Sequence, residues 1–203
     1  MNPTQKDFFA EKAKGFDGQK SNTKNVGQIA QSILKNVSFS KKMHIMDFGS
    51  GTGLLLSQVA PFVGEITAVD ISVSMTEVLK AKKDTIDCKL TILEMDLTKE
   101  TLDTKFDAII SSMTIHHIEH VQELFNKFYS LLNKGGTIAI ADLEKEDGTF
   151  HTEDTGIFHL GFDRNEFLDM AKNAGFRNLK IQTASVAEKP TGNYPIFLLT
   201  GKK

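Results

Sequence analysis

The sequence predicts an α/β fold built around a mostly parallel sheet. From residue 43 onward, apolar runs of strand length alternate with segments of helical period, which is typical of βαβ units. A glycine-rich turn at residues 49–53 follows the first apolar run and precedes a helical segment. Acidic residues follow the next two apolar runs, where the carboxyl ends of parallel strands meet at one edge. These observations predict a ligand site along that edge.

The same alternation assigns each element of the first half of the chain. Residues 4–14 and 25–36 are expected to form helices that precede the sheet. We expect helices to begin at Leu54, with Pro61 closing that helix, and at about Ser74. The expected strands are 43–48, 65–70 and 88–95.

In the second half, a polar stretch interrupts the alternation. Strands are expected at 106–112 and 137–141, around a helix at 121–132 that residues 133–136 stop. Residues 142–162 are polar and rich in glycine, and so long a loop is typical of a lid. A helix over 163–174 should end at Gly175, and strands at 179–186 and 196–200 should form a hairpin around a loop at 188–193.

The length of 203 residues fits a single domain, residues 1–203. Within it we expect an N-terminal helical cap over residues 1–36 and a lid over residues 142–162. The net charge of −2 disfavours nucleic acid as a partner, because such proteins usually present a basic face.

Cysteine usage and hydropathy predict a soluble, cytoplasmic protein. Cys88 is the only cysteine, so neither an internal disulfide nor a cysteine metal cage can form. Residues 1–17 lack an apolar signal core, and the apolar run at 196–199 is far shorter than the ~20 residues that span a bilayer. We therefore expect no membrane association.

The most informative segment is the glycine turn, which reads Asp47-Phe48-Gly49-Ser50-Gly51-Thr52-Gly53. Dinucleotide-binding turns place glycine at the first, third and sixth positions, but here the sixth is Leu54. The carboxylate of Asp47 would repel a pyrophosphate and favour a ligand with an ammonium and a sulfonium group.

This segment resembles motif I of the class I S-adenosylmethionine-dependent methyltransferases, in particular their small-molecule, ubiquinone-biosynthesis-like branch. The resemblance follows the family's motif order over about residues 7–141. Phe9 and residues 14–17 resemble that branch's leading helix, which closes over the cofactor. The resemblance implies a Rossmann-like seven-stranded mixed sheet in the order 3-2-1-4-5-7-6, with helices on both faces and an antiparallel hairpin strand.

The resemblance also assigns cofactor contacts. The glycines and Ser50 would let the cofactor approach the backbone, and Asp47 would favour its amino end. Asp70 would hold the ribose hydroxyls, a feature that NAD enzymes share. The remaining contacts would be Ile71, Asp96 and the backbone of Leu97 around the adenine, and Ser111 and Ser112 near the methionine end.

Two histidines follow the strand at 106–112 and are the catalytic candidates. A methyltransferase needs a base only when the acceptor keeps a proton, and His116 or His117 could take it. The alternative is a packing role at a helix entry. His151 and His159 lie in the polar segment with Glu153 and Asp154, which favours a lid over a metal cluster, and we predict no metal.

The sequence therefore predicts methyl transfer from S-adenosylmethionine to a small-molecule acceptor, which yields S-adenosylhomocysteine. Three alternatives stay open. They are an RNA methyltransferase, a binding module without turnover, and a nicotinamide-dependent oxidoreductase, against which Asp47 and Leu54 argue. The acceptor and the oligomeric state are not predicted.

Overall fold

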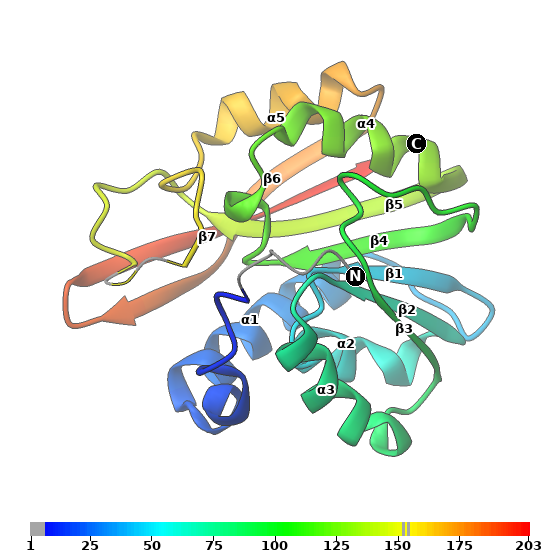
Figure 1. The fold of residues 1–203 in the computed structure, drawn as a ribbon. Helices are drawn as coiled ribbons and strands as arrows, with labels where there is room; N and C mark the ends of the chain where they lie inside the picture. Colours follow the sequence, from blue (N-terminus) through cyan, green and yellow to red (C-terminus); the bar gives the residue numbers. More distant parts are fainter. Residues whose placement is uncertain (1–6, 152, 154) are drawn as a thin grey trace.

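In the computed structural model, which describes residues 7–151, 153 and 155–203, seven strands form one sheet in the order β3-β2-β1-β4-β5-β7-β6 (Figure 1). Strands β1 to β5 run parallel, whereas β7 is antiparallel to both of its neighbours. The predicted Rossmann-like fold class and strand order are confirmed. The strands are β1 His44–Phe48, β2 Glu65–Asp70, β3 Lys89–Glu94, β4 Phe106–Ser112, β5 Leu132–Leu143, β6 Arg177–Lys189 and β7 Gly192–Lys202.

Helices cover both faces of this sheet (Figure 1). One face carries α1 Lys20–Asn36, α2 Leu54–Val59 and α3 Val73–Ala81, and the other carries α4 Val121–Leu131 and α5 Arg164–Asn173. Short 3-10 turns complete the set: η1 Ala13–Gly18, η2 Ala60–Phe62, η3 Lys83–Thr85 and η4 Ile115–His117.

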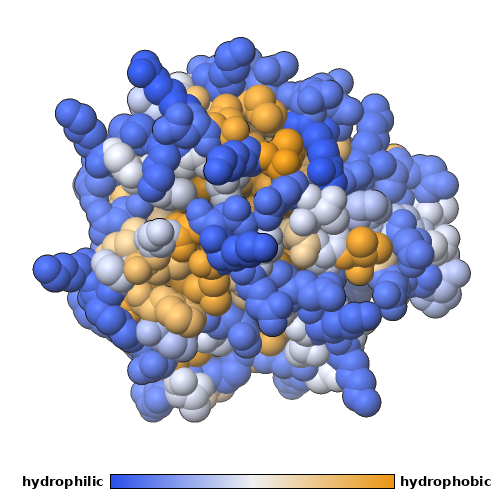
Figure 2. All heavy atoms as spheres, turned by 180° about the vertical axis from the view of Figure 1, so that it is seen from behind, coloured by the Kyte–Doolittle hydropathy of each residue, from blue (hydrophilic) through white to orange (hydrophobic). Residues whose placement is uncertain are grey.

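The core has two halves, one on each face of the sheet. Neighbouring residues of β1 show the division, because Ile45 packs among the side chains of α1 and α2 while Met46 packs among those of α4 and α5. Strands buried on both faces read as continuous apolar runs, so the central strands were placed well from sequence. Seen from behind, the surface is mostly hydrophilic with interspersed apolar patches (Figure 2), as is ordinary for a folded domain.

The N-terminal segment departs from the prediction. Residues 4–6 of the expected helix lie outside the described residues, and residues 7–12 form turns that lead into η1. The Asp7 carboxylate accepts a hydrogen bond from the Phe9 amide, 3.0 Å away, and so favours a turn there. Helix α1 begins at Lys20, earlier than expected, and the middle of the helix bonds to β6, because the Ser185 hydroxyl donates to Gln28 at 3.1 Å.

The strands of the second half are longer than their apolar runs. Strand β5 begins directly after α4, and residues 133–136 form an irregularity in its pairing with β4. The predicted loop at 188–193 is wrong, because only Pro190 and Thr191 separate β6 from β7. Strand β6 has one largely exposed face, so its polar residues hid its ends from a criterion based on apolar runs.

The segment between β5 and α5 folds back on itself. The Lys145 amide donates to the Phe162 carbonyl at 3.0 Å, and the Glu146 amide donates to the Leu160 carbonyl at 2.9 Å. The amides of Phe158 and His159 donate to the carbonyl of His116 at 2.9 and 3.2 Å. The predicted lid region is therefore docked on η4. No helix in the described part of the chain is long and apolar enough to cross a membrane.

Candidate active site

A cleft of about 2150 Å³ runs along the carboxyl edge of the sheet. Its walls are the sheet edge, the N-terminal segment and the segment after β5. Pockets for one small ligand are usually ~300–1,000 Å³, so this cleft has room for two. The predicted site residues that line it are Asp47, Gly49, Ser50, Gly51, Asp70, Ile71, Asp96, Leu97, Ser112, His116 and His117.

The glycine turn presents bare backbone to this cleft. Gly49, Gly51 and Gly53 have φ angles of 67°, 52° and 85°, which glycine adopts without strain. A Cβ atom on Gly49 would lie 2.1 Å from Cγ2 of Thr114, whereas one on Gly51 would meet nothing within 4 Å. Gly49 is therefore required by packing, while Gly51 leaves open space that a ligand can use.

Asp70, at the end of β2, holds the turn in place. Its Oδ2 accepts a hydrogen bond from the Gly51 amide at 2.6 Å, and its Oδ1 accepts one from the Ser72 amide at 2.8 Å. Burial raises the pKa of Asp70, and these amides only partly oppose the shift. The neighbouring Ile71 side chain is 47% exposed at the cleft, so it is available to pack on a flat ring.

Three buried polar side chains at the carboxyl ends of β1 and β4 have no hydrogen-bond partner among the described residues: Asp47, Ser50 and Ser112. Burial, and then the negative charge of Asp70, raise the pKa of Asp47 well above its ordinary value, although the nearby Leu56 amide lowers it slightly. An unpaired buried carboxylate is costly unless a cation approaches it. Asp47, Ser50 and Ser112 together therefore fit a ligand that carries an ammonium group.

Asp96 has hydrogen-bond and ion-pair partners within the protein, which can account for an aspartate at this position without a ligand. Its Oδ1 accepts hydrogen bonds from the amide and hydroxyl of Thr98 at 3.0 and 2.5 Å, and Oδ2 lies 2.8 Å from the Lys99 ammonium. Burial raises the pKa of Asp96, but these contacts outweigh it and leave the pKa lowered. Leu97 is 1% exposed, and its carbonyl accepts a hydrogen bond from the Lys127 ammonium at 2.5 Å, so the contact that the resemblance implies for its backbone stays a prediction.

Two predicted cofactor residues do not line the cleft. The Ser111 hydroxyl is buried and donates to the Phe48 carbonyl at 2.7 Å, so it ties β4 to β1. Gly53 caps α2, and a Cβ atom there would lie 2.4 Å from Cδ1 of Leu79 on α3. Successive side chains of a strand point to opposite faces of the sheet. Ser111 and Ser112 therefore point in opposite directions, and only Ser112 faces the cleft.

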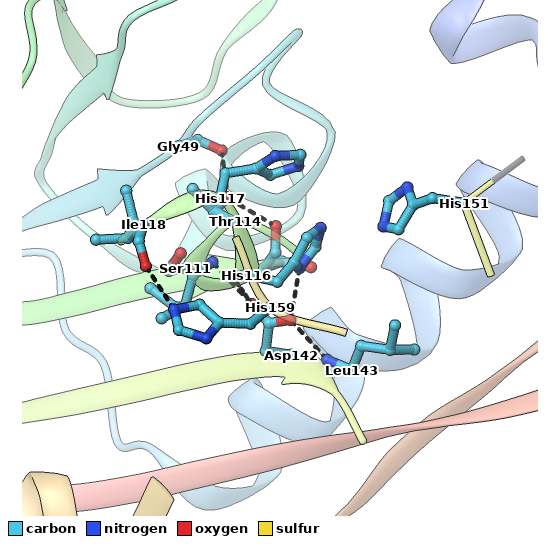
Figure 3. A network of polar contacts seen from close by, with 12 residues as sticks. Gly49, Ser111, Thr114, His116, His117, Ile118, Asp142, Leu143, His151 and His159 are labelled. Carbon is cyan, nitrogen blue, oxygen red and sulfur yellow. Dashed lines mark hydrogen bonds and ion pairs between the residues drawn. The ribbon is translucent and has the colours of Figure 1, made fainter. Parts of the chain in front are cut away.

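His116 forms a buried pair with Asp142, at the end of β5 (Figure 3). Nδ1 of His116 lies 2.7 Å from Oδ1 of Asp142, which also accepts the Leu143 amide at 2.7 Å. Oδ2 accepts the Ile115 amide at 2.7 Å. Burial alone would raise the pKa of Asp142, but His116 and the amides lower it, so the carboxylate stays ionised. No described residue hydrogen-bonds to Nε2 of His116.

His117 and His151 join this pair at the cleft wall (Figure 3). The ring centroid of His116 lies 4.3 Å from that of His117 and 5.1 Å from that of His151. Burial, and then the neighbouring His116, lower the pKa of His117 to about 4 and that of His151 to about 3. Sequence reasoning missed this convergence, since only the folding back of the segment after β5 brings His151 there.

The metal cluster considered for the polar segment does not form among the described residues, where no group of three or more metal-binding side chains is arranged around one point. Nε2 of His159 is 2.9 Å from the Ile118 carbonyl, and Glu153 pairs with Lys12 at 2.8 Å. Asp154 lies outside the described residues.

Two aspartates fasten the N-terminal segment to the edge of the cleft: Asp7, which sequence reasoning missed, and Asp17, which lies in the expected leading helix. The Ser72 hydroxyl donates to Asp7 at 2.9 Å, and the Thr52 hydroxyl donates to Asp17 at 2.5 Å. The Lys82 ammonium lies 2.5 Å from the other oxygen of Asp17. The turn residue Thr52 is thus enclosed between the sheet and the N-terminal segment.

A glycine turn with an unpaired acid before it and a second acid at the end of β2 defines a site for a nucleoside with a positively charged tail. Comparison with known proteins agrees with this class. Residues 46–140 match the family model described as a methyltransferase domain. The chain is 34% identical over 168 residues to an uncharacterized methyltransferase of Schizosaccharomyces pombe, covering 73% of this chain and 59% of that protein.

Two further comparisons point the same way. Phosphoethanolamine N-methyltransferase 1 of Zea mays is 29% identical over 161 residues, covering 75% of this chain and 32% of that protein. A chain in the complex between the Haloferax volcanii Trm112 methyltransferase activator and a methyltransferase has a TM-score of 0.80 at 18% identity, covering 98% of this chain and 99% of that one. At 18% identity, the similarity to this solved structure shows a shared fold.

Residues 46–140 therefore form a methyltransferase domain, for which the resemblance of the sequence implies S-adenosylmethionine as the cofactor. The chain spans less than two thirds of the length of the curated relatives named above. The buried, unpartnered groups of Asp47, Ser50 and Ser112 fit the charged amino acid end of this cofactor, and Asp70 fits its ribose.

Proposed function

We propose that the protein transfers a methyl group from S-adenosylmethionine to a small-molecule acceptor whose reacting atom carries a proton. The observation that carries this proposal is the buried His116–Asp142 pair, which borders the same cleft as Asp47 and Ser112. The proposal is supported by a solved phosphoethanolamine N-methyltransferase from Haemonchus contortus, bound to phosphomonomethylethanolamine and S-adenosylhomocysteine, with a TM-score of 0.72 at 17% identity and coverage of 97% of this chain and 59% of that one.

The cofactor supplies an activated methyl group, so the protein must position the acceptor and remove its proton. Asp142 fixes the His116 ring through Nδ1, which leaves Nε2 to accept the proton as the new bond to carbon forms. The negative charge of Asp142 then stabilises the imidazolium. His117 is a weaker candidate, because a pKa of about 4 makes it a poor proton acceptor.

Two segments of the chain would exclude water from the reaction. We propose residues 1–36 as a cap, in whose described part Asp17 bonds to the turn and Asp7 bonds to the residue before α3. Residues 142–162 act as a lid that docks on η4 through the carbonyl of His116. Exclusion of water strengthens the electrostatic interactions inside the cleft.

Two alternatives concern the acceptor and the reaction. An RNA acceptor remains an alternative that the net charge of −2 disfavours. A cofactor-binding module without turnover is disfavoured by the unused Nε2 of His116 at the cleft. We also propose a reducing, cytoplasmic setting, because the single cysteine, Cys88, is a free thiol.

Calorimetry with S-adenosylmethionine, S-adenosylhomocysteine and NADH tests the cofactor site first. We expect micromolar binding of the two sulfur nucleosides, none of NADH, and weaker binding in Asp70→Asn, which keeps the shape of the side chain. Transfer of labelled methyl to small amines and alcohols, but not to bulk RNA, should then depend on His116. Transfer that survives in His116→Gln at the normal rate would remove the proposed base, and transfer to RNA alone would overturn the acceptor class.

A further inference from the structure

We infer that the acceptor carries an anionic group, a phosphate or a carboxylate, that binds between Lys12, Lys189 and His151 beside the reacting end of the cleft. The inference rests on the proposed methyl transfer, because it assigns a chemical class to the acceptor in that same cleft. Its three residues come from the N-terminal segment, from the end of β6 and from the segment after β5, and all three line the cleft.

Lys189 and His151 are held together by one aromatic side chain. The Lys189 ammonium lies 3.7 Å from the centroid of the Phe150 ring and donates to the Phe150 carbonyl at 2.5 Å. The same ring lies 4.7 Å, centroid to centroid, from the imidazole of His151. Phe150 is 7% exposed, so this arrangement is fixed by packing rather than by solvent-exposed rotamers.

His151 offers a nitrogen that the protein leaves unused. Its Nδ1 lies 3.2 Å from the Thr155 hydroxyl, while Nε2 is buried and has no partner among the described residues. A buried polar atom without a partner costs free energy that a bound ligand can recover. With the ring centroid of His116 5.1 Å away, that ligand would lie beside the proposed base.

The ammonium groups of Lys12 and Lys189 lie close enough at this end of the cleft to disfavour positive charge on each other and on His151. Burial, and then the charge of Lys12, lower the pKa of Lys189. Burial also lowers the pKa of His151 to about 3, with further contributions from His116, His117, Lys189 and Lys12. An anion bound between them would relieve this repulsion and accept charge-assisted hydrogen bonds.

The acidic residues nearby do not occupy the proposed subsite. Glu153 pairs with Lys12, but its side chain is 68% exposed, so an incoming anion can replace this contact at small cost. Glu146 partly offsets the charge of Lys189 but does not line the cleft. Its Oε2 accepts hydrogen bonds from the backbone amides of residues 148–150, and its Oε1 is buried without a partner among the described residues. The Asp142 carboxylate already forms a hydrogen bond with His116.

The test titrates inorganic phosphate and acetate separately into the full chain saturated with S-adenosylhomocysteine, so that it needs no turnover. We expect millimolar binding of at least one anion, and the stronger of the two identifies the group. Lys189→Met and Lys12→Met should each weaken that binding about tenfold, as loss of a hydrogen bond to a charged group does. Lys24→Met is the matched control, because Lys24 also borders the cleft but pairs with Glu188 at 3.4 Å.

Absence of binding by either anion at tens of millimolar would overturn the inference, as would an equal loss in Lys24→Met. Should Lys189→Met fail to fold, Lys12→Met and Lys189→Arg decide the question, and Lys189→Arg should retain binding. Paired acceptors that differ only in the anionic group, such as ethylamine and β-alanine, separate this inference from the proposed function. Methylation of both at equal efficiency overturns the subsite alone, whereas anion binding without any methyl transfer overturns the proposed function alone.

Discussion

Nδ1 of His116 and Oδ1 of Asp142 lie 2.7 Å apart, and the two side chains are 2% and 0% exposed. An ionised carboxylate at this distance fixes which ring nitrogen carries the proton, and so decides what the other nitrogen can do. The two residues come from η4 and from the end of β5, which are neighbours only in the folded chain.

Asp142→Asn should lower kcat about 10²–10⁴-fold, because the amide can neither hold the ring in the same tautomer nor stabilise the imidazolium. Affinity for S-adenosylmethionine should stay within a factor of two or three, since Asp142 bonds to η4 and to its own strand. Steady-state kinetics and calorimetry on the same preparation check this. A fall in cofactor affinity as large as the fall in kcat would instead indicate a structural role.

Asp47→Asn should have opposite effects on folding and on cofactor binding. The substitution removes an unpaired buried charge, so the free protein should gain stability, on the order of 1 kcal/mol at pH 7. Cofactor affinity should fall about 10–100-fold, because the ammonium group loses its counter-charge. Thermal melts with and without S-adenosylhomocysteine measure both effects, and a variant that is less stable in both states would contradict the prediction.

Gly51→Ala and Gly53→Ala should separate ligand approach from packing. Both positions have positive φ, which costs alanine roughly 1 kcal/mol. At Gly51 the added methyl meets no protein atom within 4 Å, so the main loss should be in cofactor affinity. At Gly53 it lies 2.4 Å from Leu79, so the main loss should be in the free energy of unfolding. Denaturant titrations and calorimetry together distinguish the two.

Ser111→Ala should destabilise the fold by about 1 kcal/mol, because the Phe48 carbonyl loses its partner inside the sheet. Cofactor affinity should be unchanged, whereas Ser112→Ala should weaken binding. Calorimetry on the two variants gives the answer. Weaker binding in Ser111→Ala at undiminished stability would restore the cofactor role that its position in the sequence predicts.

The low pKa of His117 should make the protein sensitive to mild acid. The folded state protonates His117 at a pKa of about 4, against 6.5 for the free side chain, so the unfolded state binds more protons between these values. Stability from this group is therefore complete above pH 6.5 and is lost as pH falls toward 4, by on the order of 3 kcal/mol.

Urea unfolding of the wild type and of His117→Asn between pH 4 and 7 measures this dependence. The variant should lose less stability over that range, although His151, with a pKa of about 3, should retain part of the slope. His120→Asn, at the exposed residue before α4, is the control and should behave like the wild type. Identical slopes in His117→Asn and the wild type would mean that His117 titrates normally.

The sequence alone placed the central strands of the sheet and the glycine turn that follows β1. Each of these features is local, because an apolar run buried on both faces marks a central strand, and a glycine turn with Asp47 before it marks the end of β1. Asp70 could be placed for the same reason, since the end of a parallel strand has a known position in such a fold. The strand order was predicted from the resemblance to the methyltransferase family, because local sequence patterns do not say which strands are neighbours in the sheet.

Only the tertiary structure brought together the residues that we propose for the acceptor. His116, Asp142, His151 and Lys189 come from η4, β5, the segment after it and β6, and no spacing in the sequence relates them. Their approach depends on the segment after β5 folding back onto η4, through backbone hydrogen bonds that depend little on side-chain identity. The direction of Ser111 and the length of β6 were likewise decided by pairing and packing between distant parts of the chain.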